Sequence, residues 1–389
     1  GRARLMADMV AGRVWVEQRR PIRHIDPTLL LVVAGLVIVG LFAIYSATSQ
    51  TLRQDGLDPL SRVNKQLVTA VLGFVLLLLI ATFDYRFLKV YAGFIFGATL
   101  VMLLLLQIPG VAGNASGTSN YINIPGVSLL QISPSEFAKI GLIVILSAML
   151  SELRTPVPEL QDFVRVLMVA GVTMGLVFIN VEIGTTIVLM AITVGILVVA
   201  GTRAKHLITL ALASLLLIGL AFQMNVIEDY QIARLTSFLD SENASEDARY
   251  NLEQSEIAVG SGGMFGQGYL HGTQTALDYV PEQHTDFIFT VIGEEFGFAG
   301  SVFVLSLFAV LLWRAIRIAF LSKDAFGTYL ATGVASMFAV QMFVNVGMVI
   351  GIMPITGIPL PFLSYGGTAM LVNFLAVGIL LNVHMRRFK

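Results

Sequence analysis

The residues best suited to chemistry lie in the stretch Glu282-Gln283-His284-Thr285-Asp286-Phe287, where a long polar segment meets an apolar helix. Charge at the edge of an apolar segment is unfavourable and generally has a function. Asp286 is therefore the first candidate for a catalytic group, with Glu282 and His284 beside it. The structural alternative is that Thr285 or Asp286 caps the following helix. The neighbouring ionisable groups favour chemistry, since one cap needs only one oxygen.

A second polar group opens the apolar segment that begins near residue 134. Ser133 followed by Pro134 is a helix-start signal, and Glu136 stands where a capping box places its glutamate. Lys139 follows Glu136 on the same helical face. Capping accounts for Glu136 but not for Lys139, because an ammonium group at that depth is unfavourable. A cation there would suit a phosphate or diphosphate ligand.

Three more carboxylates lie at or inside apolar segments. Glu182 precedes Gly184-Thr185-Thr186, and capping of the next helix is its favoured interpretation. Glu294 lies roughly 80° around and about 12 Å along the helix from Asp286. Glu294 and Glu295 are expected to form a structural ion pair with a cation, since carboxylates inside a membrane face a cavity or pair with a cation.

The glycine-rich segments fit structural roles. Gly260–Gly268 lacks the Gly-Lys-Ser/Thr end of a P-loop and predicts tight surface turns. Gly171/Gly175 and Gly347/Gly351 have the GxxxG spacing that is typical of close helix packing. Gly357–Gly367 combines prolines with glycines and predicts irregular backbone that lines a cavity. The five histidines are scattered, which argues against a histidine metal cluster.

The elements that must position these residues are transmembrane helices. The chain of 389 residues is 56% hydrophobic and 13% charged, with a mean hydropathy of +0.82. Its continuous apolar runs of about 20 residues can each cross a bilayer core of about 30 Å. The sequence therefore predicts an all-α, polytopic integral membrane protein rather than a barrel. The net charge of −1 argues against a nucleic-acid partner, and the absence of cysteine excludes disulfides.

Ten transmembrane helices are predicted, with a large extracytoplasmic loop at 225–285 between the seventh and the eighth. Residues 1–27 form a basic cytoplasmic tail, and residues 28–385 form the membrane domain. With both termini cytoplasmic, 18 of the 24 Lys and Arg residues lie on the inside, as the positive-inside rule requires. The predicted spans are 28–48, 66–83, 88–107, 134–151, 163–180, 183–201, 204–224, 286–313, 327–352 and 362–383.

Together these motifs resemble the SEDS (shape, elongation, division and sporulation) family of bacterial peptidoglycan glycosyltransferases. The resemblance implies polymerisation of lipid II, an undecaprenyl-diphosphate-linked disaccharide pentapeptide, at the outer face of the bacterial cytoplasmic membrane. Gly357–Phe362 and Gly272–Gln274 are more similar to the RodA (elongation) branch than to the FtsW (division) branch. The resemblance covers residues 28–385 and rests on Gln131–Lys139, Gly260–Gly268, Pro281–Phe289, Gly293–Gly297 and Gly357–Gly367.

The resemblance also implies roles for single residues. Asp286 takes the place of the family's functional aspartate, and Lys139 and Glu136 match its Pro-Ser-Glu-x-x-Lys motif. Lys65 matches a basic residue before the second span. Glu182 stands where the family often has aspartate, so its longer side chain departs from the family pattern.

The resemblance implies glycosyl transfer from a lipid-linked diphosphate donor to a sugar hydroxyl. Our hypothesis is a single inverting displacement in which Asp286 acts as general base on the acceptor hydroxyl, worth roughly 10²–10⁴-fold in rate. The diphosphate leaving group needs positive charge from Lys139, Lys65 or Arg234, or from a divalent cation such as Mg²⁺ or Mn²⁺. The alternatives are a lipid II flippase, a scaffold for partner synthases and an FtsW-like division polymerase. The family also implies a class B penicillin-binding protein as partner, with other elongation-complex proteins.

Overall fold

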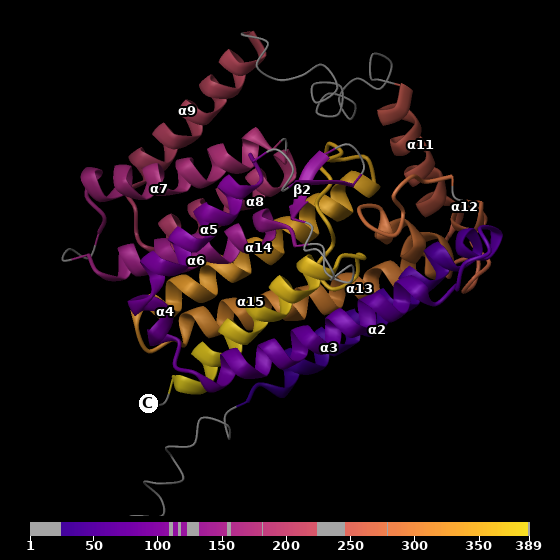
Figure 1. The fold of residues 1–389 in the computed structure, drawn as a ribbon, viewed down its shortest axis with the longest axis horizontal. Coiled ribbons are helices and arrows are strands. Elements are labelled where there is room, and N and C mark those ends of the chain that lie inside the picture. Colours follow the sequence, from indigo (N-terminus) through magenta and orange to yellow (C-terminus); the bar gives the residue numbers. More distant parts are fainter. Residues whose placement is uncertain are drawn as a thin grey trace, which may run out of the picture.

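The computed structural model describes residues 25–108, 112–115, 118–122, 132–153, 157–180, 182–223, 246–277 and 279–387. These residues are almost all helical, which confirms the all-α prediction (Figure 1). Within these ranges, seven helices are long and apolar enough to cross a membrane, and three shorter apolar helices bring the number to the ten predicted spans. The long helices are α2 (Pro27–Gln54), α3 (Ser61–Thr82), α6 (Pro134–Ser151), α7 (Leu160–Ile179), α13 (Ile288–Phe320), α14 (Ala325–Val349) and α15 (Gly367–Arg386), and the shorter ones are α5 (Ala92–Leu105), α8 (Ile183–Val199) and α9 (Ala204–Gln223).

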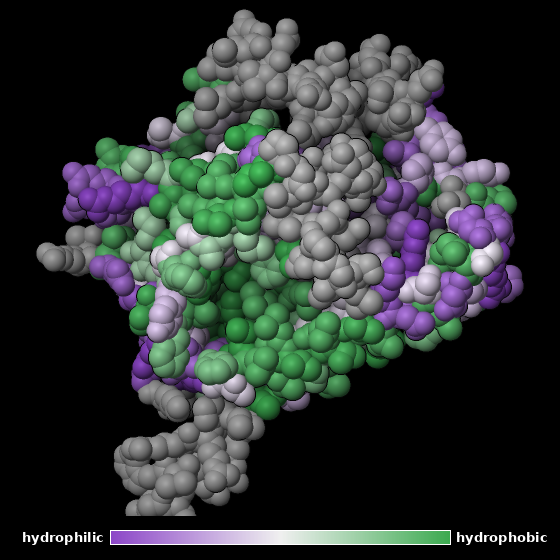
Figure 2. All heavy atoms as spheres, in the orientation of Figure 1, coloured by the Kyte–Doolittle hydropathy of each residue, from purple (hydrophilic) through white to green (hydrophobic). Residues whose placement is uncertain are grey.

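The centre of the bundle is formed by α6, α14 and α15, most of whose residues are buried. Glycines let these helices approach their neighbours: a Cβ on Gly333 of α14 would come within 2.9 Å of Ile143 of α6. A Cβ on Gly378 of α15 would lie 3.1 Å from the backbone of Leu77 of α3. By contrast, α2, α3, α7 and α13 turn large apolar side chains outward, which produces the green surface over α2 and α3 in Figure 2.

The GxxxG pair of α7 faces away from the bundle. A Cβ at Gly171 or Gly175 would have no atom of the described chain within 4 Å. The prediction that this pair packs inside the bundle is therefore wrong. Gly347 does pack, since its Cβ would come 2.7 Å from Met353, whereas Gly351 lies beyond the end of α14 with a φ of +73°.

The glycine-rich segment 260–268 forms the predicted turns, most of them exposed, and also completes α13. α13 is interrupted at Gly297, whose φ of +65° and ψ of −158° are not helical. The amides of Gln267 and Gly268 donate to α13 carbonyls before the break, at 2.9 and 3.0 Å, and carbonyls of the same segment accept from α13 amides after it. A Cβ on Gly266 would lie 2.1 Å from the Glu295 carbonyl oxygen, so only glycine permits this approach. The segment thus satisfies backbone groups that a broken membrane helix leaves free.

Two long segments between predicted spans, 108–133 and 225–285, contain described secondary structure. In 108–133, strands β1 (Ala112–Ala115) and β2 (Thr118–Ile122) pair antiparallel, with Gly113 opposite Tyr121. In 225–285, α11 (Glu246–Ser261) packs against α13, and the short helix α12 (Thr273–Ala276) follows (right side of Figure 1). The third predicted span is broken near Tyr91 into α4 (Arg86–Val90) and α5. We call the end of the bundle where α13 begins the site end, and the end where α15 finishes the opposite end.

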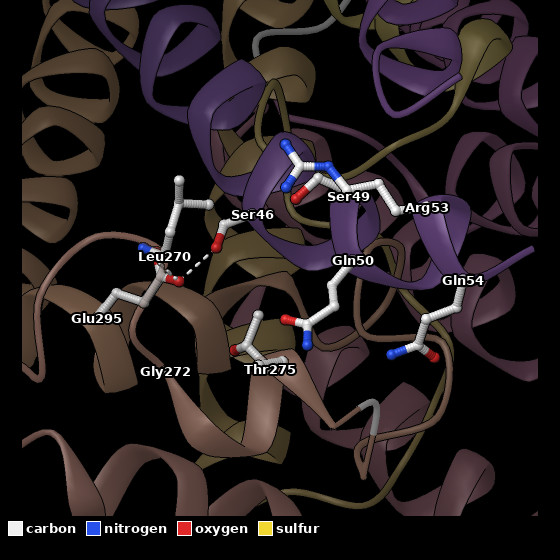
Figure 3. A pocket seen from close by; sticks show the side chains of 10 residues that line it. Ser46, Ser49, Gln50, Arg53, Gln54, Leu270, Gly272, Thr275 and Glu295 are labelled. Carbon is white, nitrogen blue, oxygen red and sulfur yellow. Dashed lines mark hydrogen bonds between the residues drawn. The ribbon is translucent and has the colours of Figure 1, made fainter. Parts of the chain in front are cut away.

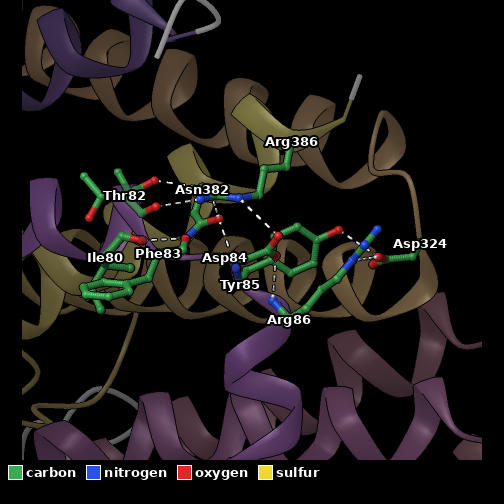
Figure 4. A network of polar contacts seen from close by, with 10 residues as sticks. Ile80, Thr82, Phe83, Asp84, Tyr85, Arg86, Asp324, Asn382 and Arg386 are labelled. Carbon is green, nitrogen blue, oxygen red and sulfur yellow. Dashed lines mark hydrogen bonds and ion pairs between the residues drawn. The ribbon is translucent and has the colours of Figure 1, made fainter. Parts of the chain in front are cut away.

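The opposite end holds a network of paired polar groups (Figure 4). Arg386 and Asn382, one turn apart on α15, donate to four carbonyl oxygens at the end of α3 over 2.5–3.2 Å. Arg386 also lies 3.6 Å from the Asp84 carboxylate, and the Tyr85 hydroxyl donates to Asp324 at 2.8 Å. The α3 carbonyl groups, which lack partners within their own helix, are satisfied in this way. They belong to Ile80, Ala81, Thr82 and Phe83.

Candidate active site

The Asp286 segment forms consecutive turns at the site end, directly before α13. Glu282 has a φ of +50°, and its carbonyl oxygen accepts from the amides of Thr285 (3.1 Å) and Asp286 (3.2 Å). Phe287 occupies the N-cap position of α13, and no side chain of the described residues caps that helix by a hydrogen bond. The Thr285 hydroxyl instead donates to the carbonyl of Glu282 at 3.0 Å. The capping interpretation is therefore wrong for Thr285.

Contacts from distant segments fix the position of Asp286. The fully buried side chain of Asn345 on α14 donates to the carbonyl oxygens of Asp286 (2.7 Å) and Ile358 (2.8 Å). Gly357 has a φ of +69°, and a Cβ there would lie 3.4 Å from Asp286 Oδ2. The irregular segment predicted at 357–367 therefore packs against the half-buried Asp286 carboxylate.

Lys139 and Glu136 form a buried ion pair at the start of α6. Lys139 Nζ lies 2.7 Å from Glu136 Oε2, and the two residues are only 1% and 8% exposed. Ser133 is the N-cap residue and Pro134 follows it, as predicted, but within the described chain no hydrogen bond from the Ser133 side chain caps α6. The capping-box prediction is wrong because the Glu136 carboxylate pairs with the ammonium group, which an apolar helix could not otherwise accommodate.

Glu182 joins this pair from the start of α8. Thr185 Oγ1 donates to its carboxylate at 3.0 Å, and Ser135 of α6 forms a second hydrogen bond with it. Burial raises the pKa of Glu182, the two hydroxyls lower it, and the nearby Glu136 charge raises it further. Glu182 is the N-cap residue of α8, but among the described residues its side chain makes no capping hydrogen bond with the helix. The capping interpretation is therefore wrong here too. A Cβ on Gly184 would lie 2.5 Å from the Thr356 carbonyl oxygen, which shows how closely α8 meets the segment beside Asp286.

Tyr121 of β2 shows that these carboxylates share one site. Burial raises the pKa of Tyr121 to about 12, and the charges of Glu182, Glu136, Asp286 and Glu282 raise it as well. Four carboxylates from three separate segments of the chain therefore act on one phenol. Nothing in the sequence around Tyr121 marks it out, because its segment is uncharged.

His284 and two residues from other segments form the border of the site. The ring centroids of His284 and Tyr365 are 5.6 Å apart, and Tyr365 N donates to the His284 carbonyl at 2.9 Å. Burial lowers the pKa of His284 to about 4, with a further contribution from the positive charge of Arg62. The imidazole is therefore neutral at pH 7. Sequence reasoning named Lys65, which is exposed on α3, whereas Arg62 one turn earlier is the cation whose charge reaches His284.

Lys139 and Arg62 supply positive charge at the site. Arg234, which was predicted to contribute, lies outside the described residues. Within the described ranges, no three His, Asp or Glu side chains lie close enough together to hold a metal ion.

Glu294 supports the loop next to the site through hydrogen bonds. Its carboxylate accepts from the amides of Gln274 (2.7 Å) and Thr275 (3.0 Å) and from the Thr275 hydroxyl (2.7 Å), which caps α12. Gln283 in turn donates to the Thr275 hydroxyl at 3.0 Å. The predicted ion pair with a cation is not found for Glu294 or Glu295 among the described residues, where both carboxylates accept hydrogen bonds from uncharged donors.

Comparisons with known proteins show the family to which the chain belongs. The family model described as "Cell cycle protein", for FtsW, RodA and SpoVE, matches residues 27–389. The chain belongs to the FtsW/RodA/SpoVE family. This confirms the resemblance seen in the motifs, and the multi-pass membrane architecture fits the family.

Individual members of the family cover nearly the whole chain. The chain is 36% identical over 368 residues to "Probable peptidoglycan glycosyltransferase FtsW" of Trichlorobacter lovleyi, which covers 94% of this chain and 95% of that one. It is 31% identical over 366 residues to "Peptidoglycan glycosyltransferase MrdB" of Escherichia coli K12, with 94% of both chains covered. A chain solved under the description "Structural coordination of polymerization and crosslinking by a peptidoglycan synthase complex" superposes with a TM-score of 0.79 at 26% identity, over 94% of this chain and 99% of that one.

Proposed function

We propose that this protein is a peptidoglycan glycosyltransferase that polymerises lipid II into glycan strands at the outer face of the bacterial cytoplasmic membrane. Relatives that cover most of the chain are named as peptidoglycan glycosyltransferases. The observation that carries the proposal is the convergence of Asp286, Glu182 and the Lys139–Glu136 pair around Tyr121 at one end of the bundle. A carboxylate base beside a buried cation is the combination that displacement of a diphosphate requires.

In the proposed reaction, the Asp286 carboxylate removes the proton from the acceptor sugar hydroxyl as its oxygen attacks the anomeric carbon of the donor. The bond between that carbon and the diphosphate oxygen breaks, and the leaving group departs with the electron pair. A single displacement of this kind inverts the anomeric centre. Lys139 stabilises the charge that develops on the diphosphate, and Glu136 holds its ammonium group in place at 2.7 Å. Asn345 and Gly357 keep the Asp286 segment in register for the proton transfer.

The orientation and the partner are also part of the proposal. We place the site end outside the cell and both termini in the cytoplasm, which agrees with the distribution of Lys and Arg. A class B penicillin-binding protein would cross-link the new glycan, and a structural relative of this chain was solved in a peptidoglycan synthase complex. Lys65 and Glu282, both exposed near the site, would guide the charged substrate.

The motifs at Gly272–Gln274 and Gly357–Phe362 support a role in cell elongation. One observation favours the division role instead: identity is 36% to the relative named FtsW and 31% to MrdB. Depletion of the protein in its own rod-shaped cells separates the two. Rounded cells are expected for the elongation role, and filaments without septa would assign the protein to division.

The test of the activity is polymerisation of labelled lipid II by the purified full chain, alone and with its transpeptidase partner. Penicillin is included so that only glycan growth is scored. Lipid II in vesicles, with the fraction on each leaflet measured in the same preparation, tests the flippase alternative. Polymer without lipid II translocation is expected, whereas translocation without polymer, with the partner present, would overturn the proposal.

A further inference from the structure

A second polar pocket lies at the site end, between the last two turns of α2 and the loop around α12 (Figure 3). Its volume is about 490 Å³, which is in the range of small-ligand sites. None of the side chains that surround Tyr121 lines it. The lining residues are Ser46, Ser49, Gln50, Arg53, Gln54, Leu270, Gly272, Thr275, Ala276 and Glu295.

Glu295 gives this pocket an unused acceptor. The residue is 1% exposed, and its Oε1 accepts from the Ser46 hydroxyl and from the amide of Leu270. Its Oε2 is buried and has no hydrogen-bond partner among the described residues. Buried carboxylate oxygens are nearly always paired, so an orphaned one that lines a pocket points to a ligand that supplies the donor.

The α2 side of the pocket is a polar stripe. Ser46, Ser49, Gln50, Arg53 and Gln54 follow the spacing of one helical face, although α2 is otherwise a long apolar helix. In Figure 3 these side chains line the pocket from α2, and the Ser46 hydroxyl meets the Glu295 carboxylate. Ser49 to Gln54 lie beyond the predicted span, which ends at residue 48, and give the pocket a polar wall at the site end.

The chemistry of the lining selects the kind of ligand. One carboxylate accepts, one guanidinium donates, and the Gln50 and Gln54 carboxamides do both. No aromatic ring is among the lining residues, so the pocket offers no flat apolar surface against which a sugar ring could stack. A peptide segment with a free amine and a carboxylate matches the set, because the amine pairs with Glu295 and the carboxylate with Arg53.

We infer that this pocket binds the peptide part of the substrate or of the newly made strand, an inference that rests on the proposed function. The wall residue Thr275 accepts a hydrogen bond from Gln283, three residues before Asp286. A peptide held here therefore lies next to the segment that carries the base. The pocket would orient a peptide-bearing sugar before transfer.

The experiment measures binding of a soluble fluorescent pentapeptide to the purified full chain in detergent, by anisotropy. The peptide has a free side-chain amine and a free terminal carboxylate. Three further probes are the peptide acetylated on its side-chain amine, the C-terminally amidated peptide and the disaccharide without peptide. We expect acetylation to weaken binding at least tenfold in the native chain and to have no effect in Glu295→Gln. Amidation should weaken it similarly in the native chain but not in Arg53→Gln.

Two controls keep the outcomes distinct. Glu253→Gln, an exposed carboxylate paired with Arg249 on α11, should bind like the native chain. Arg53 is exposed, so its variant tests the pocket even if Glu295→Gln fails to fold. Equal binding of all the peptides, or equal binding of the bare disaccharide, overturns the inference. Polymerisation is measured on the same preparation. Polymer without peptide binding would refute only the peptide-binding role of the pocket, whereas peptide binding without polymer would refute the proposed function.

Discussion

The two ends of the bundle both bury charge, but they arrange it differently. At the opposite end, Arg386 donates to α3 carbonyls and pairs with Asp84, and Asp26 caps α2 while pairing with Arg314. At the site end, four carboxylates act on Tyr121. Opposite charges at contact stabilise a fold, whereas gathered like charges destabilise it and are kept for function. The comparison supports the proposal that the chemistry takes place at the site end.

Truncation at the opposite end should have the largest effect on stability. Arg386→Ala leaves Asp84 and two α3 carbonyls without their donor and should lower the free energy of unfolding by about 4 kcal/mol. Polymerisation per folded molecule should stay within about twofold, because the change is far from the proposed base. Thermal unfolding in detergent measures it, with the exposed Arg165→Ala as the matched control. Equal stability of the two variants would contradict the structural role assigned to the network.

The buried pair of the site end should show a mixed response. Lys139→Met leaves Glu136 without its cation and should destabilise the protein by about 3 kcal/mol. Adding Glu136→Gln removes the uncompensated charge and should restore most of that stability. Polymerisation should remain at least about 100-fold reduced in both, because the leaving group has lost its cation. Recovery of activity in the double variant would show that Lys139 serves structure alone.

Sequence reasoning found the charges of the site because charge is rare in apolar helices. Asp286, Lys139 and Glu136 stood out for this reason, and the structure places Asp286 and Glu136 near Tyr121, with Lys139 paired to Glu136. The capping interpretations were wrong because local spacing cannot reveal a stronger partner. Arg62, Tyr121 and Asn345 were missed because their roles depend on contacts between distant segments. The polar stripe of α2, by contrast, has a helical spacing that could have been read from the sequence.

Asn345 combines structural and functional roles in this account, since its amide holds the segment that carries the proposed base. Asn345→Ala leaves the Asp286 and Ile358 carbonyls without a shared donor and should lower stability by about 2 kcal/mol. Polymerisation should fall by about tenfold as Asp286 loses its register. Gln341→Ala, one turn earlier on α14 and equally buried, is the control for the loss of a large amide. The same loss of activity in both variants would contradict the positioning role.

The smallest expected effect is a pH dependence from His284. The folded pKa of about 4 lies below the usual 6.5, so the unfolded chain takes up a proton first as the pH falls. Neutral His284 therefore makes its full contribution to the free energy of unfolding above pH 6.5, and this contribution is lost as the pH falls from 6.5 to 4. Given its partial exposure, we expect a loss of about 1 kcal/mol between pH 7 and 5 that His284→Gln removes. The exposed His271→Gln should keep the native profile, and an unchanged profile for His284→Gln would disprove this assignment.

The most direct test compares one isosteric change at each end. Asp286→Asn and Asp324→Asn each remove one carboxylate charge, and both polymerisation of lipid II with the transpeptidase partner and thermal unfolding are measured. Asp286→Asn should abolish polymer to at least about 100-fold below native with little change in unfolding, because a general base is worth that much. Asp324→Asn, which weakens the contact with Tyr85 and Arg86, should lower stability and keep activity per folded molecule. Near-normal polymer from Asp286→Asn would contradict the central claim.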